Sequence, residues 1–364
     1  MDESAESIKF DDKGQCNYCS DFQNTKNLIK KNKAKYDLNV LISELKKNNK
    51  NYDCIVGVSG GVDSSYVLVK CVELGLKPLA VHMDNGWNSS LAQNNISKIV
   101  KKLKIDLITY VINWKEYRSL MISFFNADVI DIELLMDHAM LAVNYRIANK
   151  YKIKNIIVGS NQSTEGFEMP KNWVWFKYDK KNIVSINKKF ENYKLKTFPF
   201  IGIYKYIYYR VFKKYKWIPL LDYFDYKKNE ALIYLQENFD FIPYPYKHYE
   251  SVFTRFYQGF ILPKKFGVDK RKIHLSNLIL TNQISRTEAN KIMETEPYHS
   301  KLELRNDTDF FLKKMEWTKV KFAEYLNRKE IKHDFYPNDF NIWKKLRFFK
   351  KIIKKKNNSK FVYR

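Results

Sequence analysis

The chain has 364 residues, of which 45% are hydrophobic, and it carries a formal net charge of +25. Its length indicates one large domain with a substantial appendage, or two domains, and no apolar run reaches the ~18 residues that a membrane helix requires. The first residues, MDESAES, are acidic and polar, which excludes a secretory signal, and the four cysteines are too few for a disulfide scaffold. We therefore expect a cytoplasmic protein.

Two explanations account for the positive charge. A basic surface is typical of proteins that bind a polyanion, whether nucleic acid, a membrane surface or a phosphorylated substrate. The lysines are nevertheless dispersed along the whole chain among many Asn, Ile, Tyr and Phe residues, which is the composition that AT-rich coding DNA produces. The charge alone does not choose between the two.

Residues 36–170 alternate between short apolar runs and amphipathic stretches. A helix is expected over residues 36–49, and a buried strand that ends in glycines follows at residues 54–58. A helix over residues 66–74 comes next, with Asp63, Ser64 and Ser65 as N-cap candidates. Further strands are predicted at residues 78–83, 107–112 and 156–158, and further helices at 88–103, 115–126 and 132–151. This alternation predicts an α/β domain with a parallel sheet.

Three loops of special composition follow predicted strands. They are SGGVDSS at residues 59–65, DNG at 84–86 and GSNQSTEG at 159–166. Because ligands bind at the carboxyl ends of the strands in such sheets, we expect these loops to form one site.

The SGGVDSS loop suits phosphate binding although it lacks the lysine of a P-loop. Gly60 and Gly61 let the backbone approach a phosphate closely, and N–H groups at the start of the following helix attract anions without a side-chain cation. Hydroxyl donors are added by Ser59, Ser64 and Ser65. Asp63 would repel phosphate on its own, so its presence indicates a Mg²⁺ ion that bridges it to the phosphates.

SGGxDSS after a buried strand resembles the loop of the PP-loop ATP pyrophosphatases, which include asparagine, GMP, NAD and argininosuccinate synthetases and the tRNA-thiolating enzymes. The resemblance covers roughly residues 50–165. It implies that ATP is cleaved between its α and β phosphates while the loop, residues 59–65, holds the leaving pyrophosphate. It also implies that Asp84 lies near the adenosine, and that Gly159, Ser160 and Asn161 complete the nucleotide pocket.

The character of the chain changes after about residue 170. Residues 171–217 mix aromatic and basic side chains and are compatible with both strand and helix. Residues 227–238, 251–293 and 306–332 are predicted to be helical, with a capping box at residues 285–288. We divide the chain into an N-terminal CxxC segment (1–35), an ATP-binding α/β domain (36–170), a mainly helical substrate-binding region (171–340) and a basic amphipathic tail (341–364).

Residues 244–289 place many polar side chains among aromatics and glycines, which favours a site over a merely basic surface. Within this stretch, KHYESVFTRFYQGFILPKKFGVDKRKIHLS joins GQCNYCSDF and SGGVDSS as a third motif. The three motifs, in this order, are similar to those of the N-acetyl sugar amidotransferases, the amidine-forming enzymes of surface polysaccharide and flagellin glycan biosynthesis. The resemblance runs from about residue 8 to about residue 295. It implies a PP-loop (adenine nucleotide alpha-hydrolase-like) core with a mainly helical C-terminal region.

This resemblance implies a specific reaction. ATP would adenylate the acetamido oxygen of a nucleotide-linked N-acetyl sugar, and ammonia would displace AMP to leave an acetamidino group, in the synthesis of an LPS O-antigen or flagellin sugar. The chain has no recognisable glutaminase, so ammonia is expected from partners similar to the glutaminase and cyclase subunits of imidazole glycerol phosphate synthase.

The candidate residues divide into two groups. Catalytic roles, including proton transfer and orientation of the sugar, are expected for Ser59, Asp63, Lys247, His248, Glu250 and His274. The substrate's phosphates are expected to contact Arg255, Lys264, Lys265, Lys270 and Arg271.

Cys16 and Cys19 form a single CxxC. Two such pairs would indicate a tetrahedral zinc site, and the family often has an earlier pair upstream that this sequence does not show. Either the pair is half of a zinc site completed by other ligands, or no zinc binds. Cys54 and Cys71 lie in apolar segments and are expected to be core residues.

Two rival functions use the same positive charge. The first is a PP-loop tRNA-modifying enzyme of the thiolation type, which would need a reactive cysteine near the loop. The second is a protein that binds DNA through residues 275–293, which the intact SGGVDSS loop disfavours. We therefore expect no nucleic-acid partner. Residues 343–356, WKKLRFFKKIIKKK, have an amphipathic pattern that suits either an anionic membrane surface or a solvated tail packed on the body.

Overall fold

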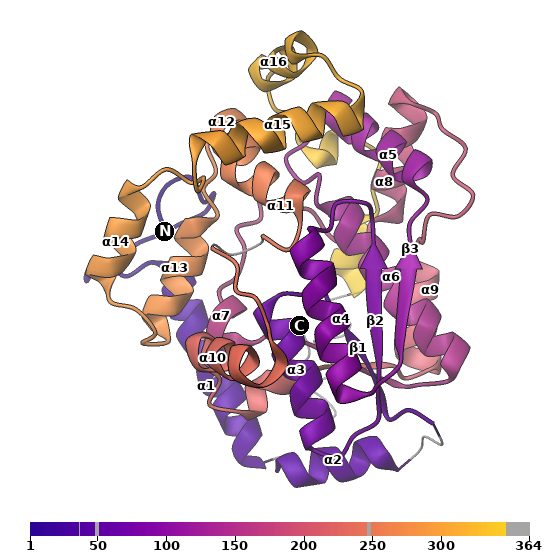
Figure 1. Ribbon diagram of the computed structural model, residues 1–364. Coiled ribbons are helices and arrows are strands. Elements are labelled where there is room, and N and C mark those ends of the chain that lie inside the picture. Colours follow the sequence, from indigo (N-terminus) through magenta and orange to yellow (C-terminus); the bar gives the residue numbers. More distant parts are fainter. Residues whose placement is uncertain (36, 48–50, 246–248, 347–364) are drawn as a thin grey trace.

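The computed structural model describes residues 1–35, 37–47, 51–245 and 249–346 (Figure 1). Its centre is a five-stranded sheet in the order β3–β2–β1–β4–β5, in which all the paired strands are parallel. The strands are β1 (Cys54–Gly57), β2 (Pro78–Asp84), β3 (Leu107–Val111), β4 (Asn155–Val158) and β5 (Lys216–Pro219). The parallel α/β sheet predicted from the sequence is confirmed.

The strand order reverses between β1 and β4. The chain runs outward from β1 through β2 to β3, and it then returns to the other side of β1 to form β4 and β5. A crevice opens at such a reversal because the loops after the two central strands leave in opposite directions. The SGGVDSS and GSNQSTEG loops follow these two strands, β1 and β4.

Helices cover both faces of the sheet because its strands alternate buried apolar side chains between the faces. Val56 and Ala80 pack with α2 (Leu38–Lys46), α3 (Val62–Glu73), α4 (Ser90–Leu103) and α10 (Lys228–Phe239). Ile55 and Leu79 point to the other face, where they pack with α6 (Leu134–Tyr151).

A third core joins the two ends of the chain. It combines Cys16 and Phe22 of the N-terminal segment with Phe253, Phe256 and other apolar residues of the C-terminal region. The helices that contribute to it or surround it are α1 (Asn17–Lys35), α5 (Trp114–Asn126), α8 (Lys180–Phe190), α11 (Val252–Phe256), the π-helix η3 (Tyr257–Ile261), α12 (Leu262–Phe266), α13 (Arg271–Leu280), α14 (Arg286–Glu294), α15 (Lys301–Met315) and α16 (Lys319–Asn327). The remaining short helices are α7 (Gln162–Glu165), α9 (Ile203–Ile207), the π-helix η1 (Tyr208–Phe212), and the 3-10 turns η2 (Leu220–Tyr223) and η4 (His333–Phe335).

Several local predictions can be compared with the structure directly. The capping box at Ser285 and Glu288 is present, and the first four strands lie within one residue of their predicted positions. The helix after the SGG turn begins earlier than expected, because Gly61 is its N-cap and Asp63, Ser64 and Ser65 lie in its first turn. The undecided segment, residues 171–217, contains α8, α9 and η1 and ends in β5. Across the described residues, no helix is both long and apolar enough to cross a membrane.

Candidate functional site

The loop between β1 and α3 takes its shape from two glycines. Gly60 has a φ of +84°, and a Cβ built on it would lie 2.6 Å from the carbonyl oxygen of Ala92. Gly61 caps α3 without a side-chain hydrogen bond to the first turn. The twelve-residue helix α3 therefore begins directly after the glycines, the arrangement that the predicted phosphate site requires.

The serines of the loop hydrogen-bond to one another across the turn. The Ser59 hydroxyl lies 3.1 Å from the Ser64 hydroxyl, and it accepts from the Gly61 N–H at 3.3 Å. Ser64 donates to the Gly61 carbonyl at 3.1 Å. Ser59 is exposed, whereas Ser65 is buried within α3. Ser59 and Ser64 thus present hydroxyls at the loop, whereas Ser65 does not.

Two side chains from distant parts of the sequence hold the Asp63 carboxylate. The Tyr226 hydroxyl donates to Oδ1, and Thr164 Oγ1 donates to Oδ2 at 3.5 Å. Burial, together with the adjacent Asp63 charge, raises the pKa of Tyr226 far above its ordinary value. The phenol therefore remains a donor at neutral pH and fixes the orientation of the carboxylate.

Gly159 brings the end of β4 directly against the start of α3. A Cβ on Gly159 would lie 2.8 Å from the Ser64 nitrogen and 2.9 Å from the Asp63 carbonyl carbon. Asn161 caps α7 by accepting from the Thr164 N–H at 2.9 Å, and its amide donates to the Gly159 carbonyl at 3.0 Å. Ser160 is exposed between them. The loops after β1 and β4 are thus in contact.

Asp84 stands at the end of β2, where its Oδ1 accepts from the Gly86 N–H at 2.8 Å and from the Asn88 amide at 3.3 Å. Beside it, His82 bonds the Val58 carbonyl through Nδ1 at 2.9 Å, which ties β2 to the residue preceding Ser59. Lys314 reaches the same loop from α15 and donates to the Gly86 carbonyl. Burial lowers the pKa of Lys314. No sequence pattern pointed to this lysine.

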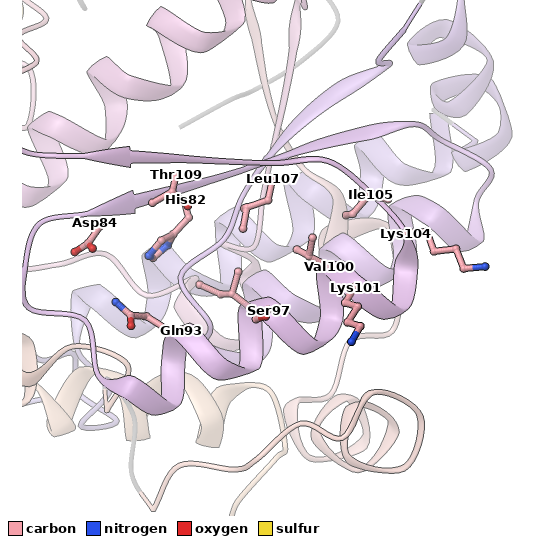
Figure 2. Close-up of a pocket in the computed structure, with 11 residues that line it drawn as sticks. His82, Asp84, Gln93, Ser97, Val100, Lys101, Lys104, Ile105, Leu107 and Thr109 are labelled. Atoms are coloured by element: carbon pink, nitrogen blue, oxygen red, sulfur yellow. The ribbon is translucent and has the colours of Figure 1, made fainter.

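A pocket of about 470 Å³ opens between α4 and the strands β2 and β3, which is large enough for a nucleoside. Figure 2 shows His82, Asp84 and Gln93 at one end of the pocket and Lys101 and Lys104 at the other. The first end adjoins the SGG loop, because Ala92 of the same helix contacts Gly60. The pocket therefore leads away from the SGG turn along the outer strands.

The C-terminal motif meets these loops at Glu250–Val252. The Ser89 N–H donates to the Glu250 carbonyl at 2.9 Å, and the Val252 N–H donates to the Trp87 carbonyl at 2.9 Å, around an antiparallel bridge between Asn88 and Ser251. The Glu250 carboxylate lies within 3.6 Å of where a Cβ on Gly61 would stand. The third motif of the sequence thus lies beside the SGG loop.

The remaining predicted catalytic residues are less closely placed. Lys247 and His248 lie outside the described residues. His274 is half-buried on α13, the helix that packs against α7. Asn277, one turn further along α13, donates to the Ser163 carbonyl at 2.6 Å and accepts from the Phe167 N–H at 2.9 Å. Asn277 therefore fastens α13 to the loop after β4, a role that sequence reasoning missed.

Of the five residues predicted to bind the substrate's phosphates, four form ion pairs within the protein. Arg255 pairs with Asp307 through two bonds of 2.6 and 2.7 Å, and Lys265 pairs with Asp128 at 3.0 Å while also donating to two carbonyls. Lys270 pairs with Glu133 at 2.7 Å, and Arg271 with Asp269 at 2.7 Å. Lys264, by contrast, is exposed. Phosphate binding by the first four would require these ion pairs to open.

A partly buried charged network lies at the amino end of α6, and no sequence pattern pointed to it. Lys177 bridges Asp131 at 2.7 Å and Asp137 at 2.9 Å. Burial, together with repulsion by Asp131 and Glu133, raises the pKa of Asp137, although Lys177 opposes the shift. Through Glu133, which holds Lys270, the network links α6 to the C-terminal motif.

The CxxC thiols lie together, with Cys16 Sγ and Cys19 Sγ 3.3 Å apart. Burial and the hydrogen bond with Cys16 raise the pKa of Cys19 to about 11. In the part of the chain that the structure describes, no set of three or more His, Cys, Asp or Glu side chains is arranged to hold a metal ion. Two thiols alone do not fit a closed zinc site, so zinc stays a prediction.

Two family models match the chain in succession. The model for NAD synthase matches residues 33–167, and the model for the LPS biosynthesis protein WbpG-like C-terminal domain matches residues 250–359. No curated protein matches.

Three similar solved structures have 14–16% identity and low TM-scores. The NH3-dependent NAD synthetase of Campylobacter jejuni subsp. jejuni NCTC 11168, in complex with the nitrate ion, has 15% identity and a TM-score of 0.29, and the match covers 48% of this chain and 74% of that one. The NMN synthetase of Francisella tularensis has 16% identity and a TM-score of 0.30, with 74% and 95% covered. The U34-tRNA thiolase NcsA of Methanococcus maripaludis, with its [4Fe-4S] cluster, has 14% identity and a TM-score of 0.32, with 77% and 82% covered.

Proposed function

We propose that this chain, which matches the family models for NAD synthase over residues 33–167 and for the WbpG-like C-terminal domain over residues 250–359, is an amidotransferase of glycan biosynthesis. Its substrate would be a nucleotide-linked N-acetyl sugar, whose acetamido group it converts to an acetamidino group at the expense of ATP. The family resemblance expected from the motifs is confirmed by the two matches. ATP use and a glycan-biosynthetic setting follow from them, while the amidine-forming reaction is our proposal.

One observation carries the proposal. The backbone bridge between residues 87–89 and 250–252 joins the WbpG-like region to the ATP domain at the carboxyl edge of the sheet. The Glu250 carboxylate consequently stands beside the phosphate loop at Gly61. A substrate held by the WbpG-like region would therefore meet ATP where the α-phosphate must lie.

The proposed reaction has two steps. The acetamido oxygen attacks the α-phosphorus, the bond between the α and β phosphates breaks, and pyrophosphate leaves into the Ser59–Ser65 loop. Ammonia then adds to the activated carbon, and the former acetamido oxygen departs as part of AMP. Activation is needed because an amide oxygen is a poor leaving group, whereas a phosphate ester is a good one. Glu250 would accept a proton from the incoming ammonia, a role that its position beside Gly61 supports.

The residues at the loop fit a magnesium ion that is held mainly through phosphates. Mg²⁺ usually keeps several waters and takes one or two carboxylates in addition to substrate phosphates. Asp63 supplies one carboxylate, already oriented by Tyr226 and Thr164. When bound, the ion would neutralise charge on the leaving pyrophosphate.

The pocket beside Asp84 and His82 is our candidate for the adenosine. Its position next to the SGG turn lets the phosphates lie over Gly60 and Gly61 while the nucleoside follows α4. Gly159, Ser160 and Asn161 would contact the phosphates from the β4 side.

We assign the basic residues of the C-terminal motif to two roles. Lys264 would contact the substrate, and the C-terminal helices would be positioned by Arg255, Lys265, Lys270 and Arg271. The ammonia-supplying partner remains part of the proposal.

The tRNA-thiolation alternative is not favoured by the cysteines. Cys54 and Cys71 are fully buried, and their mutual hydrogen bond, together with burial, raises the pKa of Cys54 well above its ordinary value. Neither thiol is therefore poised to act at the phosphate loop.

A product assay tests the proposal. The purified protein is incubated with ATP, Mg²⁺, concentrated ammonium and a panel of nucleotide-linked N-acetyl sugars, and the mixture is analysed by mass spectrometry. AMP together with a sugar in which NH replaces O is the expected result. AMP formation that depends on tRNA, with no change in any sugar, would move the protein to the thiolation class.

A further inference from the structure

One helix exposes a stripe of apolar side chains to solvent. Tyr204, Tyr208, Val211 and Phe212 of α9 and η1 are 90%, 44%, 60% and 72% exposed. Their spacing places them on a single helical face. The opposite face is packed, since Tyr209 stacks on Tyr145 with ring centroids 4.9 Å apart and Tyr206 lies 4.7 Å from Tyr178.

The same segment is strongly basic. Residues 192–221 contain no Asp or Glu, and their cations are Lys194, Lys196, Lys205, Arg210, Lys213, Lys214 and Lys216. Lys205, Lys213 and Lys214 are exposed beside the apolar stripe. The apolar stripe and the three exposed lysines beside it together form what we call the aromatic–basic face: Tyr204, Lys205, Tyr208, Val211, Phe212, Lys213 and Lys214.

The face lies at the end of the molecule away from the ATP site. Residues 213–215 lead directly into β5, whose first residue pairs with the first residue of β4, so the tip of the face stands at the amino edge of the sheet. The exposed residues Lys150, Tyr151, Lys152 and Lys154 precede β4 at the same edge. The phosphate loop occupies the carboxyl edge, and Figure 1 shows α9 on the opposite side of the molecule from α13 and α14.

The described part of the C-terminal tail also ends beside this helix. Trp343 is buried, with ring centroids 4.9 Å from Tyr206 and 4.6 Å from Phe176. The sequence that follows, KKLRFFKKIIKKK, repeats the combination of lysines with large apolar residues. Trp343 thus packs on the side of this helix opposite the aromatic–basic face.

We propose that the aromatic–basic face binds the surface of an anionic lipid bilayer. Tyr, Phe and Val side chains enter the headgroup region while the surrounding lysines pair with acidic headgroups, as in interfacial amphipathic helices. A bilayer fits better than RNA for two reasons. Val211 offers no ring for a base to stack on, and a substrate RNA would have to reach the opposite edge of the sheet. The inference does not rest on the proposed reaction, and the orientation leaves the ATP site open to soluble substrates.

Vesicle binding by the full chain tests the inference. The protein should sediment with vesicles of phosphatidylethanolamine and phosphatidylglycerol, and much less with phosphatidylcholine alone. Each lysine near an anionic leaflet contributes about 1 kcal/mol to the free energy of membrane binding, which is roughly fivefold in affinity. K213Q/K214Q should therefore weaken binding roughly 30-fold by the same reasoning. V211S/F212S should weaken binding as well, whereas the control K301Q/L302S, an exposed pair on α15, should bind like wild type.

A second measurement separates the face from the tail. Brominated lipids quench a tryptophan that enters the bilayer, so F212W should gain quenching over wild type, whereas L302W should not. Equal quenching in F212W and wild type, or unchanged binding in V211S/F212S, would overturn the inference. Loss of tRNA binding in these variants without loss of vesicle binding would assign the face to RNA instead.

Discussion

Replacing Gly159 with Ala tests the contact between the loops after β1 and β4. The new Cβ would meet backbone atoms of Asp63 and Ser64 at 2.8–3.0 Å. Ordinary carbon contacts begin at about 3.5 Å, so the loop after β4 must retreat by roughly 0.7 Å. These neighbours are backbone atoms of the phosphate loop itself and cannot rotate away.

The structure sets the magnitude of both effects. Overpacking of this kind costs about 1–3 kcal/mol of folding free energy, partly offset by about 0.4–1 kcal/mol from the stiffer unfolded chain. We expect a net loss of roughly 0.5–2 kcal/mol in urea unfolding. A displacement approaching 1 Å at a reacting centre lowers the rate by about 100-fold, so AMP formation should fall far more than stability does.

Gly202 provides the matched control, because a Cβ there would lie 3.5 Å from Lys180 atoms and needs no unusual backbone angle. G202A should unfold and turn over like wild type. Wild-type AMP formation by G159A would refute the argument that the two loops meet at the nucleotide.

Four further predictions concern single side chains and pH. D63A should abolish ATP cleavage while circular dichroism shows an intact fold, and retained activity would contradict the magnesium role. Y226F keeps the packed ring but removes the donor to Asp63, so the Mg²⁺ concentration needed for half-maximal rate should rise severalfold; an unchanged Mg²⁺ dependence would remove Tyr226 from the site. D307N leaves the Arg255 charge without its partner. Because the Arg255 and Asp307 side chains are only 16% and 6% exposed, the free energy of unfolding should fall by about 3–5 kcal/mol. A higher KM for the sugar with unchanged stability would instead indicate that Arg255 binds the substrate's phosphate. His138 donates from Nδ1 to the Lys177 carbonyl and accepts at Nε2 from the Ile201 N–H, and burial lowers its pKa to about 4. Because this folded-state pKa lies below the unfolded value of about 6.5, folding stability is lost as the pH falls from 6.5 towards 4. H138Q should therefore lose less thermal stability than wild type between these pH values.

The sheet and its loops could be predicted because their signals are local. Four strands are short apolar runs, of which β1, β2 and β4 end at or directly before a glycine or an aspartate, and the SGG turn lies directly between a strand and a helix. β5 escaped prediction because KWIP has only two apolar residues before its proline and follows a run of Tyr and Lys that favours no one structure. Its place is fixed by pairing with β4, which no local pattern reveals.

The partners of the site residues could not be predicted, since they are far apart in the chain. Asp63 meets Tyr226 across 163 positions, and Arg255 meets Asp307 across 52. Sequence reasoning places a basic residue near a site by composition, but it does not show whether a carboxylate already occupies it. This limit is illustrated by Arg255, Lys265, Lys270 and Arg271. Glu250, by contrast, shows that a motif of mixed polar residues can indicate a segment that contacts the SGG loop.

The central claim is that the acetamido oxygen of a nucleotide-linked sugar is adenylated. The most direct test follows that oxygen by isotope. A sugar nucleotide carrying heavy oxygen in its acetamido group is converted with ATP, Mg²⁺ and ammonium, and the AMP is analysed by mass spectrometry. The account predicts that the heavy oxygen appears in the phosphate of AMP, with one label for each amidine formed. Unlabelled AMP, or label in the pyrophosphate, would contradict it.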